Sequence, residues 1–99
     1  MAAYFIAQYV VKDPKLYREY QAGAAPTIQA SGAELLAFDV ASESIEGTPP
    51  GPHTVILRFE SKQAAKAWYE SPAYQAVVGK RLAATEGFAV ISESMNLGR

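Results

Sequence analysis

Four segments of the chain carry the residue pattern of β-strands. They cover residues 4–12, 34–45, 53–60 and 88–94, and neither glycine nor proline occurs within them. The first segment, YFIAQYVVK, is dominated by aromatic and β-branched residues, which favour strands. It stops at Asp13-Pro14, because proline has no N–H to donate to a sheet. The pattern therefore predicts four strands.

Between the first two predicted strands, apolar residues recur every three or four positions, which is typical of an amphipathic helix. Asp13 is a favourable N-cap for this helix, Pro14 suits its first turn and Gly32 suits its C-terminal cap. Pro26 lies inside the pattern, where its missing N–H and its ring are expected to kink the helix or split it in two.

A second helix is predicted between the third and fourth strands, with Ser61 at its start. Ser71-Pro72 repeats the cap-and-proline pair of Asp13-Pro14, so the helix is expected to restart there and to end at Gly87. Residues 46–52 contain three prolines and two glycines, and this composition leaves only a loop between the second and third strands.

The order of these elements, βαββαβ, is that of the ferredoxin-like fold. It predicts an α+β protein with a four-stranded antiparallel sheet and both helices on one face of the sheet. A chain of 99 residues and 10.7 kDa has the size of one compact domain, so residues 1–99 are expected to form a single domain.

The sheet face without helices is expected to be apolar as well. The first strand places Ile6 and Val10 there with Tyr4 and Gln8, and the third adds Ile56 and Arg58. Monomers rarely expose an apolar patch of several hundred Å², so we predict a two-fold homodimer in which two sheets pack face to face. The alternative is a monomer whose strand composition reflects only local β-propensity.

Charge and composition exclude several classes of function. The chain has 9 Lys and Arg, 10 Asp and Glu and a net charge of −1, which argues against binding to nucleic acid or a membrane surface. The longest apolar run, residues 1–7, is too short to span a bilayer. The absence of cysteine excludes disulfides, thiolate metal sites and thiol nucleophiles. No secretory signal is visible, so a cytoplasmic location is expected.

Three motifs together resemble a known family. They are Asp13-Pro14-x-x-Tyr17-x-x-Tyr20, then Glu46-Gly47 before the proline-rich loop, then Ala64-Ala65-x-x-Trp68-Tyr69-x-Ser71-Pro72-x-Tyr74-Gln75. The family is the domain of unknown function thirteen-thirty, and the resemblance spans nearly the whole chain. The last motif is the most specific, because it joins two helix segments in a way that a generic amphipathic sequence does not reproduce.

The resemblance implies a dimeric α/β barrel, in which two ferredoxin-like subunits pack sheet against sheet. It implies no particular reaction. The wider superfamily contains cofactor-free monooxygenases, lactone isomerases, haem-handling proteins and stress-induced binding modules, so the fold alone does not select a function.

Aromatic residues on the predicted helices supply a candidate ligand site. Tyr20, Trp68 and Tyr74 are predicted to wall a flat apolar pocket whose hydroxyls orient a small ring-bearing ligand, with Tyr17 as a further candidate at its rim. The alternative for each, and for Tyr69, is ordinary core packing.

Arg81 lies seven residues after Tyr74 and shares its helical stripe, so its buried charge needs an anion. One interpretation is an internal salt bridge with Glu46 or Asp39, and the other is that Arg81 receives a ligand carboxylate. Glu46 is a candidate general base, with fixation of its own loop as the alternative. Glu46, Tyr74 and Arg81 are therefore the candidates for a catalytic role.

His53 is the only histidine, and it stands where the proline-rich loop meets the third strand. No partner that would orient it can be recognised, so a surface or capping role is expected, and neither haem nor any other cofactor or metal is predicted. Gln8 and Arg58 are expected to set the register of the dimer interface, with Arg58 pairing across the dimer axis with Asp39 or Glu60 of the second copy.

Two functions remain open. The first is binding of a small aromatic or carboxylated metabolite in a pocket of each subunit, extended to cofactor-free monooxygenation or isomerisation. The second is a dimeric binding or stress-response module without catalysis, its interior filled by its own side chains. A cavity of roughly 300 Å³ or more beside Trp68 and Tyr74 would favour the first.

Overall fold

The computed structural model describes residues 1–95 of the chain. The elements are β1 (Ala3–Val11), α1 (Pro14–Ser31), β2 (Glu34–Asp39), β3 (His53–Phe59), α2 (Lys62–Glu70), α3 (Pro72–Ala84) and β4 (Thr85–Glu93). This order confirms the predicted βαββαβ arrangement, with the second helical region divided into α2 and α3.

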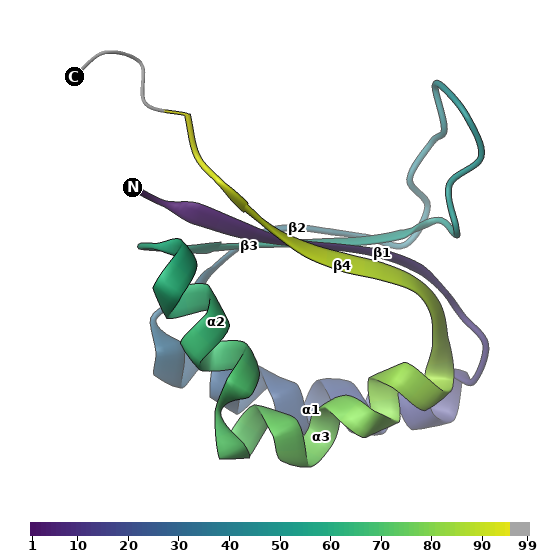
Figure 1. The fold of residues 1–99 in the computed structure, drawn as a ribbon. Coiled ribbons are helices and arrows are strands. Elements are labelled where there is room, and N and C mark those ends of the chain that lie inside the picture. Colours follow the sequence, from purple (N-terminus) through teal and green to yellow (C-terminus); the bar gives the residue numbers. More distant parts are fainter. Residues whose placement is uncertain (96–99) are drawn as a thin grey trace.

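The four strands form one antiparallel sheet in the order β2-β3-β1-β4. All three helices lie on one face of this sheet, and the opposite face carries no helix (Figure 1). The ferredoxin-like α+β fold is therefore confirmed. β2 and β4 are the edge strands, and β1 and β3 lie at the centre.

The helix ends follow the capping residues in the sequence. The side chain of Asp13 accepts a hydrogen bond from the Leu16 N–H at 3.1 Å, and Ser71 accepts one from the Tyr74 N–H at 3.3 Å. Gly32 ends α1 in the left-handed conformation, with φ of 79°, which glycine adopts without steric cost. The predicted restart at Ser71-Pro72 is confirmed.

Two predicted boundaries are wrong. Of the two outcomes expected at Pro26, the split does not occur, because α1 continues through that residue. β2 ends at Asp39 rather than at residue 45, where the side chain of Asp39 accepts the Ala41 N–H at 2.8 Å and starts a turn. Gly87 lies inside β4, where a Cβ would come within 2.1 Å of the Gln8 carbonyl oxygen.

The core fills the space between the sheet and the helices. Alternate residues of β1 point into it, and the first strand shows the expected alternation of buried and half-buried positions. Phe5, Tyr9 and Leu57 from the sheet meet Trp68 and Tyr74 from the helices, and all five are nearly inaccessible. Aromatic rings thus form most of this layer.

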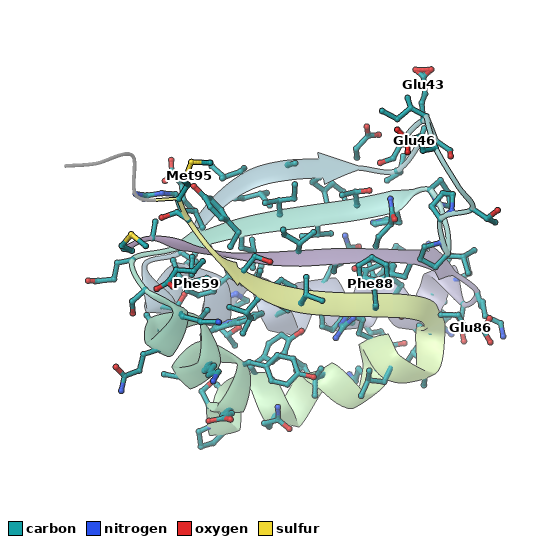
Figure 2. All side chains as sticks on the ribbon, turned by 45° about the horizontal axis from the view of Figure 1, so that its top comes forward. Glu43, Glu46, Phe59, Glu86, Phe88 and Met95 are labelled. Atoms are coloured by element: carbon teal, nitrogen blue, oxygen red, sulfur yellow. The ribbon has the colours of Figure 1, made fainter. Side chains whose placement is uncertain are left out.

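The uncovered face of the sheet is only partly apolar, because Glu34, Thr54 and Arg58 lie on it beside an apolar strip that crosses β3, β1 and β4. Ile6 pairs with Ile56 on one side and with Val90 on the other. Phe88 and Val90 of β4 keep 47% and 45% of their surface exposed. Figure 2 turns this face toward the viewer and labels Phe88 on it. Among the described residues, no helix is long and apolar enough to cross a membrane.

Candidate functional site

A cavity of about 170 Å³ lies between the sheet and α1. Its lining is mostly aromatic and aliphatic, with Arg81 as the one charged residue. Exposed lining residues, Ala25 of α1 and Leu35 and Phe38 of β2, mark an opening between the helix and the edge strand. The lining residues are Phe5, Tyr9, Tyr17, Tyr20, Gln21, Ala24, Ala25, Ile28, Leu35, Phe38, Val55, Leu57, Trp68 and Arg81.

Arg81 brings a positive charge into this apolar space. It lies in the last turn of α3 and keeps 5% of its surface exposed. Its guanidinium carbon is 5.6 Å from the centroid of the Tyr9 ring, a cation–π distance. Within residues 1–95, no carboxylate forms an ion pair with Arg81 and its Nε has no hydrogen-bond partner. A buried cation without an anion is costly, and this one faces a cavity.

Four tyrosines surround Arg81 and are joined in pairs. The hydroxyls of Tyr20 and Tyr74 are 2.7 Å apart, and those of Tyr9 and Tyr17 are also 2.7 Å apart. Each pair links α1 to another part of the fold, which is α3 in the first case and β1 in the second.

Burial raises the pKa of all four tyrosines above the ordinary value. Desolvation also acts on Arg81, but its interactions with Tyr74 and Tyr20 outweigh that effect and raise the pKa of Arg81. At neutral pH the four phenols are therefore neutral and the guanidinium is charged, so the cluster carries a net positive charge.

His53 is buried, and the prediction of a surface or capping role is wrong. It pairs with Tyr9 across β3 and β1, which turns its ring toward the helices. Its Nε2 is 3.1 Å from the Tyr17 hydroxyl, and its ring stacks on Tyr9 with centroids 5.3 Å apart. Burial lowers the pKa of His53, so the ring is neutral at pH 7.

Trp68 of α2 closes one end of the cavity. Its indole N–H donates to the Thr27 hydroxyl of α1 at 3.1 Å, and its ring lies 4.1 Å from that of Tyr74, centroid to centroid. It also meets the edge of Phe5 from β1. The single tryptophan is therefore held in a fixed place at the cavity wall.

The structure brings together most of the predicted site residues. Tyr20, Trp68 and Arg81 line the cavity, and Tyr74 stands directly behind Tyr20 through their shared hydrogen bond. Glu46 does not join them. It is exposed on the loop between β2 and β3, which extends beyond the sheet away from the helices (Figures 1 and 2).

The predicted ion pair of Arg81 within the chain does not form. Arg81 pairs with neither Glu46 nor Asp39, because both carboxylates lie outside the core and Asp39 accepts the Ala41 N–H at 2.8 Å. Arg58 lies 3.6 Å from Glu34, its neighbour across β2 and β3, and its pairing across a dimer axis stays a prediction. Gln8 donates to the Thr54 hydroxyl at 3.2 Å on the same face.

Sequence reasoning missed Tyr9 and His53 as members of the site. The alternation of β1 places Tyr9 on the helix-facing side, so its burial was predictable, but its contact with Arg81 was not. The position of His53 depends on the pairing of β1 with β3, which no local pattern reveals. Over the described part of the chain, no cluster of His, Asp or Glu is placed to hold a metal ion.

The fold and this site define a class of small ferredoxin-like proteins with a cavity under the sheet. The sequence matches the family "Domain of unknown function (DUF1330)" over residues 2–95, and the chain belongs to that family. The resemblance noted in the sequence is therefore confirmed. No curated protein matches the sequence significantly.

Several solved structures share the fold. A protein of unknown function from Rhodopseudomonas palustris, RPA0582, has a TM-score of 0.78 at 16% identity, over 96% of this chain and 83% of that one. SnoaB, a cofactor-independent oxygenase from Streptomyces nogalater, has a TM-score of 0.65 at 12% identity, over 99% of this chain and 98% of SnoaB. HapK from Hahella chejuensis has a TM-score of 0.64 at 15% identity, over 98% of this chain and 96% of HapK. At these identities the likeness is one of fold.

Proposed function

We propose that the protein binds a small metabolite with a single ring and a negatively charged oxygen in the cavity between the sheet and α1. The observation that carries this proposal is Arg81, a buried guanidinium that faces the cavity without a carboxylate partner among the described residues. A carboxylate, phenolate or enolate of the ligand supplies the missing charge. Tyr9, Tyr20 and Trp68 offer ring faces and edges to the ligand ring.

The size of the cavity limits the ligand. Its volume of about 170 Å³ falls below the roughly 300 Å³ that a drug-sized ligand requires. An engineered protein cavity of about 150 Å³ accepts benzene, so a single six-membered ring is the matching size. Fused-ring ligands are excluded from the cavity unless its walls move.

The chemistry that we propose for this site is oxygenation without a cofactor. A ring anion held against Arg81 is electron-rich and can itself reduce O₂. One oxygen atom then bonds to a ring carbon and the other leaves as water with two hydrogens from the ring substrate, which becomes a quinone. The fold that this chain shares with SnoaB, a cofactor-independent oxygenase, supports the choice. An isomerisation by proton abstraction would pass through the same kind of anion.

A non-catalytic binding module is the second candidate. The small volume of the cavity favours it, because most of the interior is filled by the protein's own aromatic side chains. In that case the ligand would bind and leave unchanged.

We further propose that the working form is a homodimer that buries the uncovered face of the sheet. Ile6, Ile56, Phe88 and Val90 give this face an apolar centre, and apolar surface of this kind drives association. The polar Gln8 and the ion pair of Arg58 with Glu34 lie on the same face of the sheet and would fix the register of the two sheets.

The proposed function is tested through the fluorescence of Trp68, the only tryptophan, which lines the cavity. We expect one-ring phenolic acids to quench it saturably, and fused-ring acids, quinones and lactones to do so weakly. Arg81→Leu should weaken binding at least about tenfold, which is ~1.4 kcal/mol. Lys80→Gln removes a neighbouring exposed charge of α3 and should change nothing. A panel without any saturable quench would overturn the proposal.

A further inference from the structure

We propose that His53 is the terminal proton acceptor of this cavity and receives the proton of an acidic ring hydroxyl on the ligand through Tyr9 and Tyr17. This inference rests on the proposed function, and it restricts the class of ligand to rings that carry an acidic hydroxyl. The ring would enter as a neutral phenol or enol and become an anion inside the cavity.

A continuous chain of polar atoms leads from the cavity to His53. Tyr9 and Tyr17 both line the cavity. Their hydroxyls are 2.7 Å apart, and the Tyr17 hydroxyl is 3.1 Å from His53 Nε2. His53 itself does not line the cavity, and it lies on a second crevice beside Val40 and Arg18 at the molecular surface. The chain therefore joins a ligand space to an imidazole with its own route to solvent.

Each proton that leaves one oxygen in this transfer is taken up by the next group of the chain. The ligand O–H bond breaks and its proton passes to the Tyr9 oxygen, while the Tyr9 proton passes to Tyr17 and the Tyr17 proton to His53 Nε2. Both tyrosines end neutral, an N–H bond has formed on His53 and the ligand oxyanion faces Arg81. The step requires the neutral imidazole with its proton on Nδ1, the tautomer that accepts at Nε2.

The groups around His53 make its protonation depend on the negative charge of the ligand. The groups that face the ring are Tyr9 from β1, Tyr17 and Arg18 from α1, and the uncharged Phe38 from β2. Within residues 1–95, no carboxylate pairs with His53, and burial lowers its pKa. An imidazolium here has no resident counter-ion, so a ligand anion on the far side of the tyrosine pair favours its formation.

The test measures proton release when a one-ring phenol binds. The probe is 4-nitrophenol, whose phenolate alone is yellow, titrated calorimetrically in two buffers of different ionisation enthalpy. The pH is set about one unit below the pKa of the free probe. For the natural sequence we expect a yellow bound probe and almost no proton released. For His53→Gln, which keeps a hydrogen-bond acceptor, we expect about one proton released per probe bound as phenolate, or a colourless bound probe.

Two further variants separate a relay from a structural tie. Tyr17→Phe keeps the ring but removes the hydrogen bonds that link a protonated His53 to the ligand anion, so proton release should rise above that of the natural protein. This variant also covers the case in which His53→Gln fails to fold. Tyr69→Phe removes a hydroxyl outside the cavity lining and should match the natural sequence. Equal proton release in the natural protein, His53→Gln and Tyr17→Phe, or a colourless probe in the natural protein, overturns the relay alone. Failure of the probe to bind at all contradicts the proposed function instead.

Discussion

Arg81 is the residue that decides what the cavity can accept. Replacing a buried charge by an apolar side chain is often neutral or stabilising, because the desolvation cost disappears. Arg81→Leu should therefore keep or raise the melting temperature while it weakens anion binding. A site that gains stability when its key residue is removed is one selected for function. A melting temperature that falls by more than about 10 °C, which is roughly 2 kcal/mol in a chain of this size, would show that Arg81 mainly stabilises the fold.

The buried titratable residues predict a stability maximum between two limits of pH. The folded-state pKa of His53 is lowered, so the unfolded chain binds more protons below about pH 6.5 and stability falls there as the pH falls. The folded-state pKa values of Tyr9 and Tyr20 are raised, so the unfolded chain loses protons first above about pH 10 and stability falls as the pH rises.

Thermal unfolding across this range checks both limits. His53→Gln should reduce the loss of thermal stability at acid pH and leave the loss at alkaline pH unchanged. Tyr20→Phe should reduce the loss of stability at alkaline pH. It should also lower the free energy of unfolding by about 1 kcal/mol, because it removes the hydrogen bond to Tyr74. An acid side that is unchanged in His53→Gln would show that other groups cause it.

At the scale of elements, the close contact of α1 with α3 holds the cavity wall in place. A Cβ at Gly23 would come within 2.6 Å of Val77 Cγ1 and 3.4 Å of its Cβ. Val77 is β-branched and cannot rotate away easily, so the two helices would have to separate. Since Tyr20 and Arg81 lie on these same helices, their separation would also enlarge the cavity.

Gly23→Ala should therefore destabilise the protein by about 1 kcal/mol or more, even though alanine favours a helix by a similar amount, because overpacking costs about 1–3 kcal/mol. The matched control is Gly79→Ala on α3, where a Cβ meets nothing within 4 Å, and stability should rise by up to about 1 kcal/mol. Val77→Ala should rescue Gly23→Ala. Denaturant unfolding compares these three variants with the natural protein, and a stabilised Gly23→Ala would show that the helices are loosely packed.

The elements also show how far sequence reasoning reaches. Strand alternation separated the two faces of β1 correctly, and Asp13, Gly32 and Ser71 marked helix ends by local hydrogen bonding. The end of β2 at Asp39 has a local mark that sequence reasoning overlooked, the turn in which Asp39 accepts the Ala41 N–H. Local pattern could not show that Gly87 lies within β4, because its close approach to the backbone of Gln8 and Tyr9 decides that. The same holds for the site. Helical spacing indicated Tyr20, Trp68 and Arg81, whereas His53 joined it through strand pairing.

At the scale of the whole molecule, the uncovered sheet face leads us to predict a dimer of about twice the 10.7 kDa of the chain. Val90→Asp places a charge on this face beside Ile6 and should produce monomers, because a carboxylate buried without a partner is costly. Leu82→Asp, at an exposed position on α3 outside this face, should remain dimeric. Sedimentation at micromolar concentration distinguishes the two, and a natural protein that sediments as a monomer would refute the assembly.

The central claim is that this chain keeps a buried positive charge for a one-ring anion. It is tested most directly by comparing benzoate with benzamide, two rings of nearly equal shape that differ in charge, through Trp68 fluorescence. We expect the natural protein to prefer benzoate by at least about tenfold, and this preference to vanish in Arg81→Leu. Equal affinity for benzoate and benzamide in the natural protein, or an unchanged preference in Arg81→Leu, would contradict the account.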